Sequence, residues 1–327
     1  MSEPGAGGLS VSVVVPTYRR PDYVRECLRH LELLRTSPRE VLVVDASPDE
    51  LTRDVVAEFA GASYLRNDLG PSTTPESRDI GLRAATGDVV AFVDDDAYVD
   101  ADWLDELVAC YADARVAGVG GRIVNGQPGE DRDGLDRIGR LLPDGRLLGH
   151  FTADPGRTIG VDHLLGANMS FRRSALLEVG GVHGQYPGPC VCEETDISLR
   201  QRARGRRLVF NPRAVVRHVS APYAIKGDRF DRRWHFYARR NQQAMYLRVF
   251  GPRSVYPGRL AGTLLRELRM RCAWTVRAVG GRVPGLDRRA RLRAPAVILR
   301  SAIELTGLAV GTGAGLWERR AERRSAR

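Results

Sequence analysis

The chain has 327 residues, of which 43% are hydrophobic; it can bury a sizeable core, and its length indicates one large globular domain, alone or with an appendage. Its net charge of +10 is unevenly spread, because residues 200–327 carry 31 Lys and Arg against 7 Asp and Glu, while residues 1–199 carry 19 against 33. The Cys190-Val191-Cys192 spacing excludes a CxxC redox or zinc site, and residues 1–8 lack the basic start and apolar run of a secretory signal.

The first 125 residues alternate between short apolar runs and segments of helical periodicity. Strands are predicted at residues 10–15, 40–44, 63–65, 89–93 and 116–124. Helices are predicted from Pro21 onward and over residues 50–59, 76–85 and 101–112. Because strands that alternate with helices form parallel sheets, we expect an α/β fold with a Rossmann-like, mostly parallel, doubly wound sheet flanked by helices.

The next hundred residues are less regular. Residues 125–160, rich in Gly, Asp, Arg and Pro, have no clear period and predict an inserted loop region that could form a lid. Order returns with a predicted strand over residues 164–171, helices over 174–179 and 193–204, and a strand pair over 207–219 that ends in His218.

Three consecutive carboxylates, Asp94, Asp95 and Asp96, follow the apolar strand over residues 89–93. The carboxyl ends of parallel strands meet at one edge of a sheet, where open α/β folds bind their ligands. Repulsion between carboxylates packed this closely is relieved by protonation or by a divalent metal ion. A solvated acidic turn before a helix is the alternative to a metal site.

Other polar groups stand at predicted strand ends, whereas the glycine signatures of common nucleotide sites are missing. No GxGxxG follows the first strand and no GxxxxGK is present, which argues against a dinucleotide dehydrogenase or a P-loop enzyme. Residues 10–225 contain, in this order, the motifs SVVVPTYRRPDYVRECL, VLVVDASPDE, SRDIGLRAATGDVVAFVDDDAYVDADWL, LLGANMSFRRSALLEVGG and CEETDISLRQRARGRRLVFNPRAVVRHVS. Over this range the chain resembles inverting glycosyltransferases of family 2, which have the GT-A fold.

The resemblance implies a nucleotide-sugar site. The residues that it places around the nucleotide are Pro16, Thr17, Tyr18, Arg19, Asp45, Arg78, Asp94 and Asp95. Asp45 would meet the base, since a carboxylate can accept an N–H of uracil, thymine or guanine. Asp94 and Asp96 would form the DxD metal motif, with Asp95 in a structural or supporting role. A divalent ion there would neutralise the charge that grows on the diphosphate leaving group.

A general base must take the proton of the acceptor hydroxyl. The family pattern is Glu-Asp-x-Asp, with the second acid as base, whereas this chain has Glu193-Glu194-Thr195-Asp196. Glu194 therefore stands at the base position with one extra methylene, and Asp196 and Glu193 remain alternatives. Family members often use a histidine such as His218 as a metal ligand, and an imidazole beside carboxylates favours Mn²⁺ over Mg²⁺, which stays possible.

We expect three regions: a flexible N-terminus (residues 1–9), a GT-A domain (10–225) and a basic, helical C-terminal region (226–327). Residues 296–317 could span a bilayer, lie on its surface or pack as a soluble helix, because Arg300 and Glu304 interrupt the apolar run. The glycines of this segment, Gly307, Gly311 and Gly315, are spaced by four, which would let two helices approach closely.

The expected activity is metal-dependent, inverting transfer from a nucleotide-diphosphate sugar, with UDP or dTDP favoured and GDP possible, in polysaccharide or glycolipid synthesis of the cell envelope. The acceptor would be a glycan or a lipid-linked glycan. The protein would lie at the cytosolic face of the cell membrane, with peripheral contact through the C-terminal region. A homodimer is left open. A metal-dependent nucleotidyl- or phosphotransferase is the rival enzyme. A nucleic-acid-binding protein is the rival outside enzymes, but no binding motif accompanies the basic charge.

Overall fold

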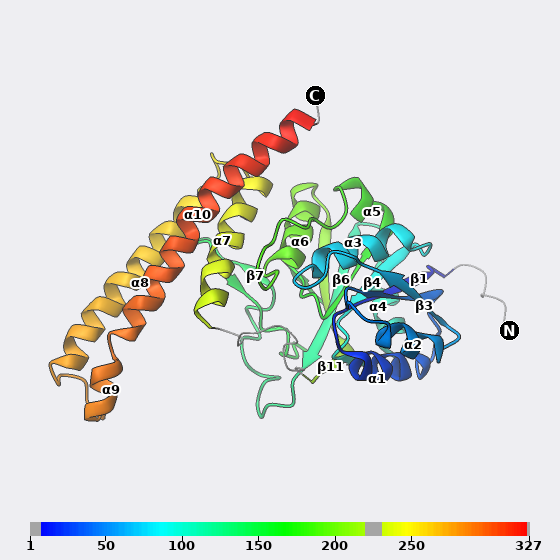
Figure 1. Cartoon of the computed structure of the whole chain (residues 1–327), viewed down its shortest axis with the longest axis horizontal. Helices are drawn as coiled ribbons and strands as arrows, with labels where there is room; N and C mark the ends of the chain where they lie inside the picture. The colour runs from blue at the N-terminus through cyan, green and yellow to red at the C-terminus, as the bar shows by residue number, and fades with distance from the viewer. Residues whose placement is uncertain (1–7, 220–230, 326–327) are drawn as a thin grey trace. The chain divides into compact units, whose positions relative to one another are not determined.

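A nine-stranded sheet organises the first two thirds of the chain in the computed structural model, which describes residues 8–219 and 231–325 (Figure 1). Its strands run in the order β3-β2-β1-β4-β10-β6-β11-β5, and β9 pairs with β11. Their bounds are β1 (Val11–Thr17), β2 (Glu40–Asp45), β3 (Ala62–Arg66), β4 (Val89–Val93), β5 (Ala97–Val99), β6 (Val116–Val124), β9 (Ile159–Val161), β10 (Asn168–Arg172) and β11 (Arg207–His218). The predicted α/β fold with a mostly parallel sheet is therefore confirmed.

Helices cover this sheet. They are α1 (Pro21–Glu32), α2 (Leu51–Ala57), α3 (Thr74–Ala84), α4 (Trp103–Ala109), α5 (Arg173–Glu178) and α6 (Glu193–Ala203). The helices α1 and α2 pack together on one face, whereas α3 lies with α5 and α6 on the other (Figure 1). β4 is fully buried along its length, as the unbroken apolar run over residues 89–93 predicts for a central parallel strand.

The fold departs from the expected pattern at two strands of this sheet and in the insert. β5 is a three-residue strand too short for a periodicity signal, and it pairs antiparallel with the end of β11. β11 is one strand rather than the expected pair, because its ladder with β6 slips between Asn211 and Val215 instead of turning back. Pro212 stands at this slip, where a strand tolerates a residue without an N–H. The insert over residues 125–160 contains the hairpin β7 (Arg140–Leu141) and β8 (Leu147–Leu148).

Contacts divide the chain into two units. The sheet unit comprises Met1–Leu141, Leu147–Gln185 and Glu193–Lys226, and the helical unit comprises Leu142–Arg146, Tyr186–Cys192 and Gly227–Arg327. The helices of the second unit are α7 (Arg232–Val249), α8 (Val255–Val279), α9 (Arg288–Arg293) and α10 (Ala296–Ser325). The predicted boundary at residues 225 and 226 lies outside the described residues, and the three-region division stays a prediction.

Glycines bring α10 against the backbone of α7. A Cβ on Gly307 would lie 2.3 Å from the carbonyl oxygen of Phe236, and one on Gly311 would lie 2.3 Å from that of Arg240. Gly315 continues the row one turn further along α10. The glycines spaced by four therefore act as the sequence indicates, within this chain, because only a residue without a side chain allows such an approach.

The helical unit also holds the tip of the β7–β8 hairpin, residues 142–146. The side chains of Gln242 and Tyr246 on α7 both donate to the carbonyl oxygen of Gly145, at 3.0 and 2.8 Å. Thr263 on α8 donates to the carbonyl oxygen of Asp144 at 3.1 Å. The insert is thus fixed at its tip by side chains that come about a hundred residues later.

A second loop, residues 186–192, is held in the same way. The fully buried amide of Asn241 donates to the carbonyl oxygens of Pro187 and Val191, at 3.2 and 3.1 Å. The guanidinium of Arg248 stacks over the ring of Tyr186, 4.9 Å from its centroid. This loop ends at Cys192, so the chain passes directly from it into the first turn of α6.

Candidate active site

The carboxyl ends of the parallel strands bring the predicted polar residues to one edge of the sheet. Thr17 and Asp45 end β1 and β2 and are register partners across the parallel ladder. Asp94 follows β4, which is also parallel to β1, and His218 ends β11, which is parallel to β6. The topology, rather than nearness in sequence, assembles this edge.

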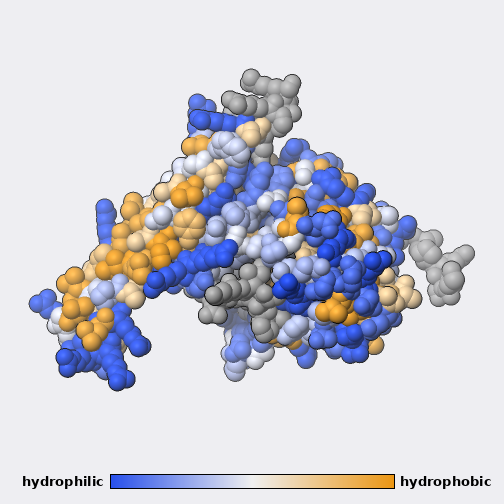
Figure 2. Space-filling view, viewed as in Figure 1, coloured by the Kyte–Doolittle hydropathy of each residue, from blue (hydrophilic) through white to orange (hydrophobic). Residues whose placement is uncertain are grey.

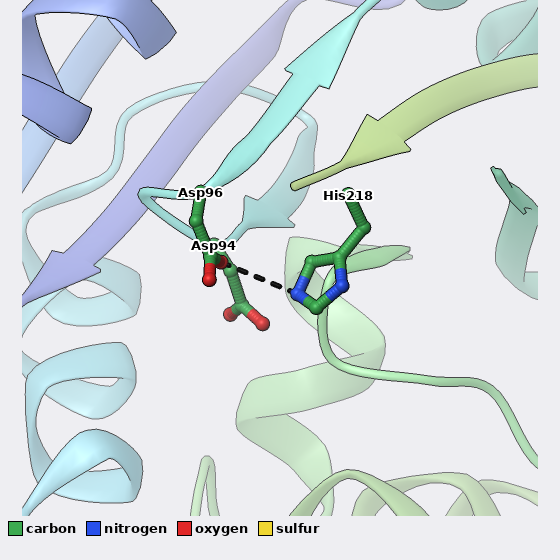
Figure 3. Close-up of side chains that lie close together, drawn as sticks. All are labelled: Asp94, Asp96 and His218. Atoms are coloured by element: carbon green, nitrogen blue, oxygen red, sulfur yellow. Dashed lines mark ion pairs between the residues drawn. The ribbon is translucent and has the colours of Figure 1, made fainter. Parts of the chain in front are cut away.

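Asp94, Asp96 and His218 converge there (Figure 3). Each offers one ligand atom, and these atoms lie within 4.8 Å of one another. The Nε2 of His218 is 3.3 Å from Oδ1 of Asp96. Two carboxylates and an imidazole form a donor set that could hold a divalent metal ion.

Asp95 makes different contacts from its neighbours. Its Oδ2 accepts a hydrogen bond of 2.7 Å from the hydroxyl of Thr17, and its Oδ1 accepts one of 3.0 Å from Arg20. Burial raises the pKa of the Asp95 carboxyl to about 7, although the nearby charge of Arg20 opposes this shift. These contacts fix the end of β1 to the loop after β4.

Sequence reasoning selected Arg19 in the PTYRR motif and missed Arg20. Arg19 is exposed, has φ of 54°, and lies over the ring of Tyr18 at 5.6 Å from its centroid. Arg20 instead lies against the triplet, with Nη1 3.0 Å from Asp95 and 3.5 Å from Oδ2 of Asp96. The signal was a second arginine just before Pro21, which starts α1, but the motif alone could not tell which arginine faces the carboxylates.

Arg78 is 3% exposed and connects two acidic motifs. Its Nη2 lies 2.7 Å from Oδ1 of Asp94, and its Nη1 pairs with Oε1 of Glu193. Gly166 makes room for this guanidinium, because a Cβ there would lie 2.6 Å from Arg78 Nη2. Arg78 is therefore near the predicted metal ligands, and Glu193 is held by it as an ion-pair partner.

The other two candidate bases on α6, Glu194 and Asp196, have different surroundings. Asp196 is fully buried, and its Oδ2 pairs with Nε of Arg200 at 2.7 Å and with His183 at 3.7 Å. Burial raises the pKa of the Glu194 carboxyl; Arg78 opposes this, and the charge of Asp94 adds to it. Asp196 and Arg200 are four residues apart on a helix, and this spacing was the sequence signal for their pairing.

Asp45 is fully buried at the end of β2. Its Oδ1 accepts a hydrogen bond of 2.9 Å from the backbone N–H of Ser47, and its Oδ2 accepts one of 3.2 Å from the hydroxyl of Tyr64. The backbone N–H of Arg19 donates to the hydroxyl of Ser47 at 2.7 Å. The predicted nucleotide residues at the ends of β1 and β2 therefore belong to one hydrogen-bonded group.

Asn168 and Trp103 form a buried hydrogen bond within the sheet unit. The indole N–H of Trp103 donates to the amide oxygen of Asn168 at 2.9 Å. The amide nitrogen of Asn168 donates to the carbonyl oxygens of Arg122 and Ala214 at 3.0 and 2.9 Å. With Trp103 fully buried and Asn168 1% exposed, this pair ties β10 to its neighbours.

The chain is similar in sequence to a known family and to individual proteins of it. The model of Glycosyl transferase family 2 matches residues 12–180. The glucosyl-dolichyl phosphate glucuronosyltransferase of Haloferax volcanii is 29% identical over 270 residues, covering 76% of this chain and 82% of that protein. The pre-mycofactocin glycosyltransferase of Mycobacterium tuberculosis is 31% identical over 228 residues, covering 65% of this chain but only 43% of that protein.

Solved structures show the same fold. The mannosyltransferase PcManGT from Pyrobaculum calidifontis, in complex with GDP-Man and Mn²⁺, has a TM-score of 0.58 at 18% identity and covers 96% of this chain and 89% of its own. Residues 1–349 of Staphylococcus aureus TarS, in complex with UDP-GlcNAc, have a TM-score of 0.54 at 16% identity and cover 95% and 93%. The sheet and its helices are those of GT-A glycosyltransferases.

Proposed function

The chain belongs to glycosyltransferase family 2, and from this premise we propose that it transfers a sugar, with inversion and with a divalent metal ion, from a nucleotide-diphosphate sugar to an acceptor hydroxyl. That it is a glycosyltransferase using a nucleotide-sugar donor follows from the family and its relatives. One observation supports the requirement for a metal ion: the ligand atoms of Asp94, Asp96 and His218 lie within 4.8 Å of one another at the strand ends. Between the two enzyme classes, family membership favours glycosyl transfer over nucleotidyl transfer.

In this proposal Asp94, Asp96 and His218 hold the metal ion, with Mn²⁺ favoured and Mg²⁺ possible. Bound there, it would supply positive charge to the diphosphate leaving group. Asp96 and His218 are both largely buried, so their ligand atoms need little reorganisation to bind an ion. Arg78 orients Asp94 through the 2.7 Å contact. Asp95 acts through structure, because Thr17 and Arg20 hold its carboxylate.

For the nucleotide we propose the group that joins the ends of β1 and β2. The nucleotide would be lined by Pro16, Thr17, Tyr18 and Arg19. The exposed guanidinium of Arg19 would bind its phosphates. Asp45 would meet the base through Oδ2, which accepts one hydrogen bond from Tyr64 and can accept a second, whereas Oδ1 already accepts two from Ser47. Uracil and thymine are favoured, and guanine stays possible.

We propose Glu194 as the general base. As the acceptor oxygen attacks the anomeric carbon, the bond from that carbon to the diphosphate oxygen breaks, and the hydroxyl proton passes to Glu194. A single displacement of this kind inverts the anomeric centre. Asp196 is disfavoured because Arg200 and His183 compete for its carboxylate, and Glu193 because Arg78 pairs with it. A placed base contributes about 10²- to 10⁴-fold to the rate.

Thermal unfolding in a matrix of ligands tests this function. UDP, GDP and dTDP are each added with and without Mn²⁺ to the wild type and to Asp96→Ala. A ligand that binds only the native state raises the melting temperature, so one nucleotide should do so with Mn²⁺ and much less without it. Without ligand, Asp96→Ala should melt at the same temperature as the wild type. It should lose the increase in melting temperature that the nucleotide and Mn²⁺ cause, and it should lose sugar transfer. Full transfer by Asp96→Ala would overturn the metal role.

The acceptor proposal comes from the relatives. The name of the Haloferax volcanii protein contains a glucosyl-dolichyl phosphate, a sugar carried on a lipid. We propose a glycan or lipid-linked glycan acceptor for this chain, in cell-envelope polysaccharide or glycolipid synthesis at the cytosolic face of the membrane. The basic C-terminal region supports this, since anionic lipid surfaces attract arginine-rich segments. A homodimer remains compatible with it.

A further inference from the structure

The helix α10 has the reverse of the usual amphipathic pattern. Between Ser301 and Trp317 its exposed residues recur every one to four positions and carry no charge: Ala302, Thr306, Ala309, Val310, Gly313 and Trp317. Val310 is 48% exposed and Trp317 is 71% exposed. A helix on the surface of a soluble protein normally buries its apolar stripe and exposes its charged residues. The outward face of α10 is thus apolar for about four turns.

The charged residue of this stretch faces inward. Glu304 is 1% exposed, and its carboxylate lies 3.1 Å from Arg271 on α8 and 3.8 Å from Arg239 on α7. His235 on α7 and Arg300 on α10 complete its surroundings, at 3.7 and 3.2 Å. Burial alone would raise the pKa of Glu304, and these arginines instead lower it. The ion pairs hold α10 to α7 and α8 and leave its outer face free of charge.

The neighbouring helix extends the apolar surface. Met270, Trp274, Val276 and Val279 on α8 are 63%, 39%, 71% and 56% exposed. Figure 2 shows hydrophobic residues gathered along the hairpin of α8 and α10, with hydrophilic residues at its α9 end. Single exposed apolar side chains are ordinary, but a contiguous patch of them marks a surface that binds something.

Charge decides the partner. From Val255 to Arg300 the sequence has eleven arginines and two acidic residues. We propose that the outer faces of α8 and α10, here called the docking face, bind the surface of an anionic lipid bilayer, with α10 lying along the membrane plane. Apolar side chains enter the acyl boundary while arginines meet anionic headgroups. A second copy of this chain is disfavoured because it would bring two arginine-rich surfaces together.

The helix lies on the bilayer rather than across it. The helical segment Arg288–Ala321, which comprises α9 and most of α10, has the length and apolar composition needed to cross a membrane. Crossing would either pull Glu304 away from Arg239 and Arg271, or carry the charged residues of α7 into hydrocarbon with it. Both alternatives are costly, because charges at bilayer depth are expensive. The contacts of Gly307 and Gly311 with the α7 backbone oppose separation of the two helices.

This inference deepens the proposed function by naming a membrane surface as its partner. It rests on the proposed function only in taking a membrane as the place where the protein acts. Its test is flotation of the full-length protein with phosphatidylcholine vesicles containing 30% or no phosphatidylglycerol. Full-length variants are required because a chain ending before α7 would leave residues 142–146 and 186–192 without their helix partners. The variant is Val310→Glu/Trp317→Glu, and the control is Leu33→Glu/Leu51→Glu, at leucines 69% and 58% exposed in the sheet unit.

We expect the wild type and the leucine control to float with the anionic vesicles, and the α10 variant to bind about tenfold or more weakly. Binding to vesicles without phosphatidylglycerol should also fall about tenfold or more. Asp96→Ala should float like the wild type, so loss of catalysis and loss of docking are separate results. Equal flotation of the α10 variant would overturn the docking face. So would a lipid-free dimer, seen by light scattering, that this variant dissociates.

Depth separates docking from crossing. Val310→Trp in a Trp274→Phe/Trp317→Phe background places a tryptophan near the middle of α10, and the same background with Val310 retained gives the quenching of Trp103 and Trp234 that must be subtracted. On the membrane plane, the fluorescence of the introduced tryptophan should be quenched more by lipids brominated near the headgroup than by lipids brominated at the chain ends. Stronger quenching by the deep bromines would show that α10 spans the bilayer and would overturn the in-plane proposal.

Discussion

Arg78 Nη2 lies 2.7 Å from Asp94 Oδ1 in a site where the arginine side chain is only 4% exposed. Because the same guanidinium also pairs with Glu193, one residue on α3 connects the loop after β4 with the first turn of α6. The distance between the proposed metal site and the segment that carries the proposed base therefore depends on Arg78.

Arg78→Lys should lower kcat/KM about tenfold or more, because a lysine cannot hold two carboxylates in the fork geometry of a guanidinium. Arg78→Ala should also lower the free energy of unfolding by about 3 kcal/mol, since it leaves the buried carboxylate of Glu193 without its partner. Steady-state kinetics and denaturant unfolding measure the two effects. The matched control is Arg83→Lys on the same helix, where the side chain is 63% exposed and little change is expected.

Metal removal should stop sugar transfer, and re-addition of Mn²⁺ should restore it better than Mg²⁺. His218→Ala removes the one nitrogen donor of the predicted set, so the ratio of the rates with Mn²⁺ and with Mg²⁺ should fall about tenfold. Rates after chelation and titration with each ion measure this ratio. An unchanged ratio would show that the imidazole is not a ligand, whatever the absolute rate.

Glu194→Gln should mainly lower the activity, whereas Asp196→Asn should mainly lower the stability. Glu194→Gln should reduce kcat by about 10²- to 10⁴-fold with little change in stability. Asp196→Asn should weaken a buried ion pair with Arg200 and cost about 3 kcal/mol of stability, while the folded enzyme keeps most of its kcat. If Asp196→Asn lost kcat and kept its stability, the assignment of Glu194 would be wrong.

The pH profile gives a second check on Glu194. A base works only when ionised, and its raised pKa means that activity falls off at a higher pH on acidification than for an ordinary glutamate near about 4.3. The midpoint of the acid limb of kcat against pH measures this.

Gly311→Ala should destabilise the helical unit by about 1 to 3 kcal/mol, because the new Cβ would overlap the carbonyl oxygen of Arg240. Gly313→Ala provides the control on the same helix: no atom lies within 4 Å of its Cβ position, so alanine should be neutral or stabilising by up to about 1 kcal/mol. Thermal unfolding of both variants measures the difference. Equal effects would contradict the packing of α10 on α7.

The sheet was predictable because its strands are continuous apolar runs between helices of clear period. β4 is an example: all five of its residues are buried, and its carboxyl end brings Asp94 to the site edge. β5 escaped prediction because three residues cannot display a period. The course of β11 was misjudged because Asn211-Pro212 resembles a turn, whereas Asn211 instead bonds to the carbonyl oxygen and carboxylate of Glu106.

Within the site, residue types were easier to predict than pairings. The family resemblance implied metal-ligand roles for Asp94, Asp96 and His218, and the local sequence placed each of them at a predicted strand end. The partner of Glu193 depends on how α3 approaches α6, which no local pattern encodes. The same holds for Arg20, whose contact with Asp95 spans 75 positions of sequence.

Because the chain is synthesised from its N-terminus, the contacts of α7 with two earlier loops form only after a delay. Gly145 leaves the ribosome 97 residues before Gln242, and Pro187 leaves 54 residues before Asn241. At about 5 to 20 residues per second, the hairpin tip waits roughly 5 to 20 s for its partner. The loop that leads into Glu194 thus reaches its native contacts only after α7 has emerged. A nascent chain interrupted before α7 carries every residue of the proposed metal site and still lacks the α7 side chains that hold the loop before α6.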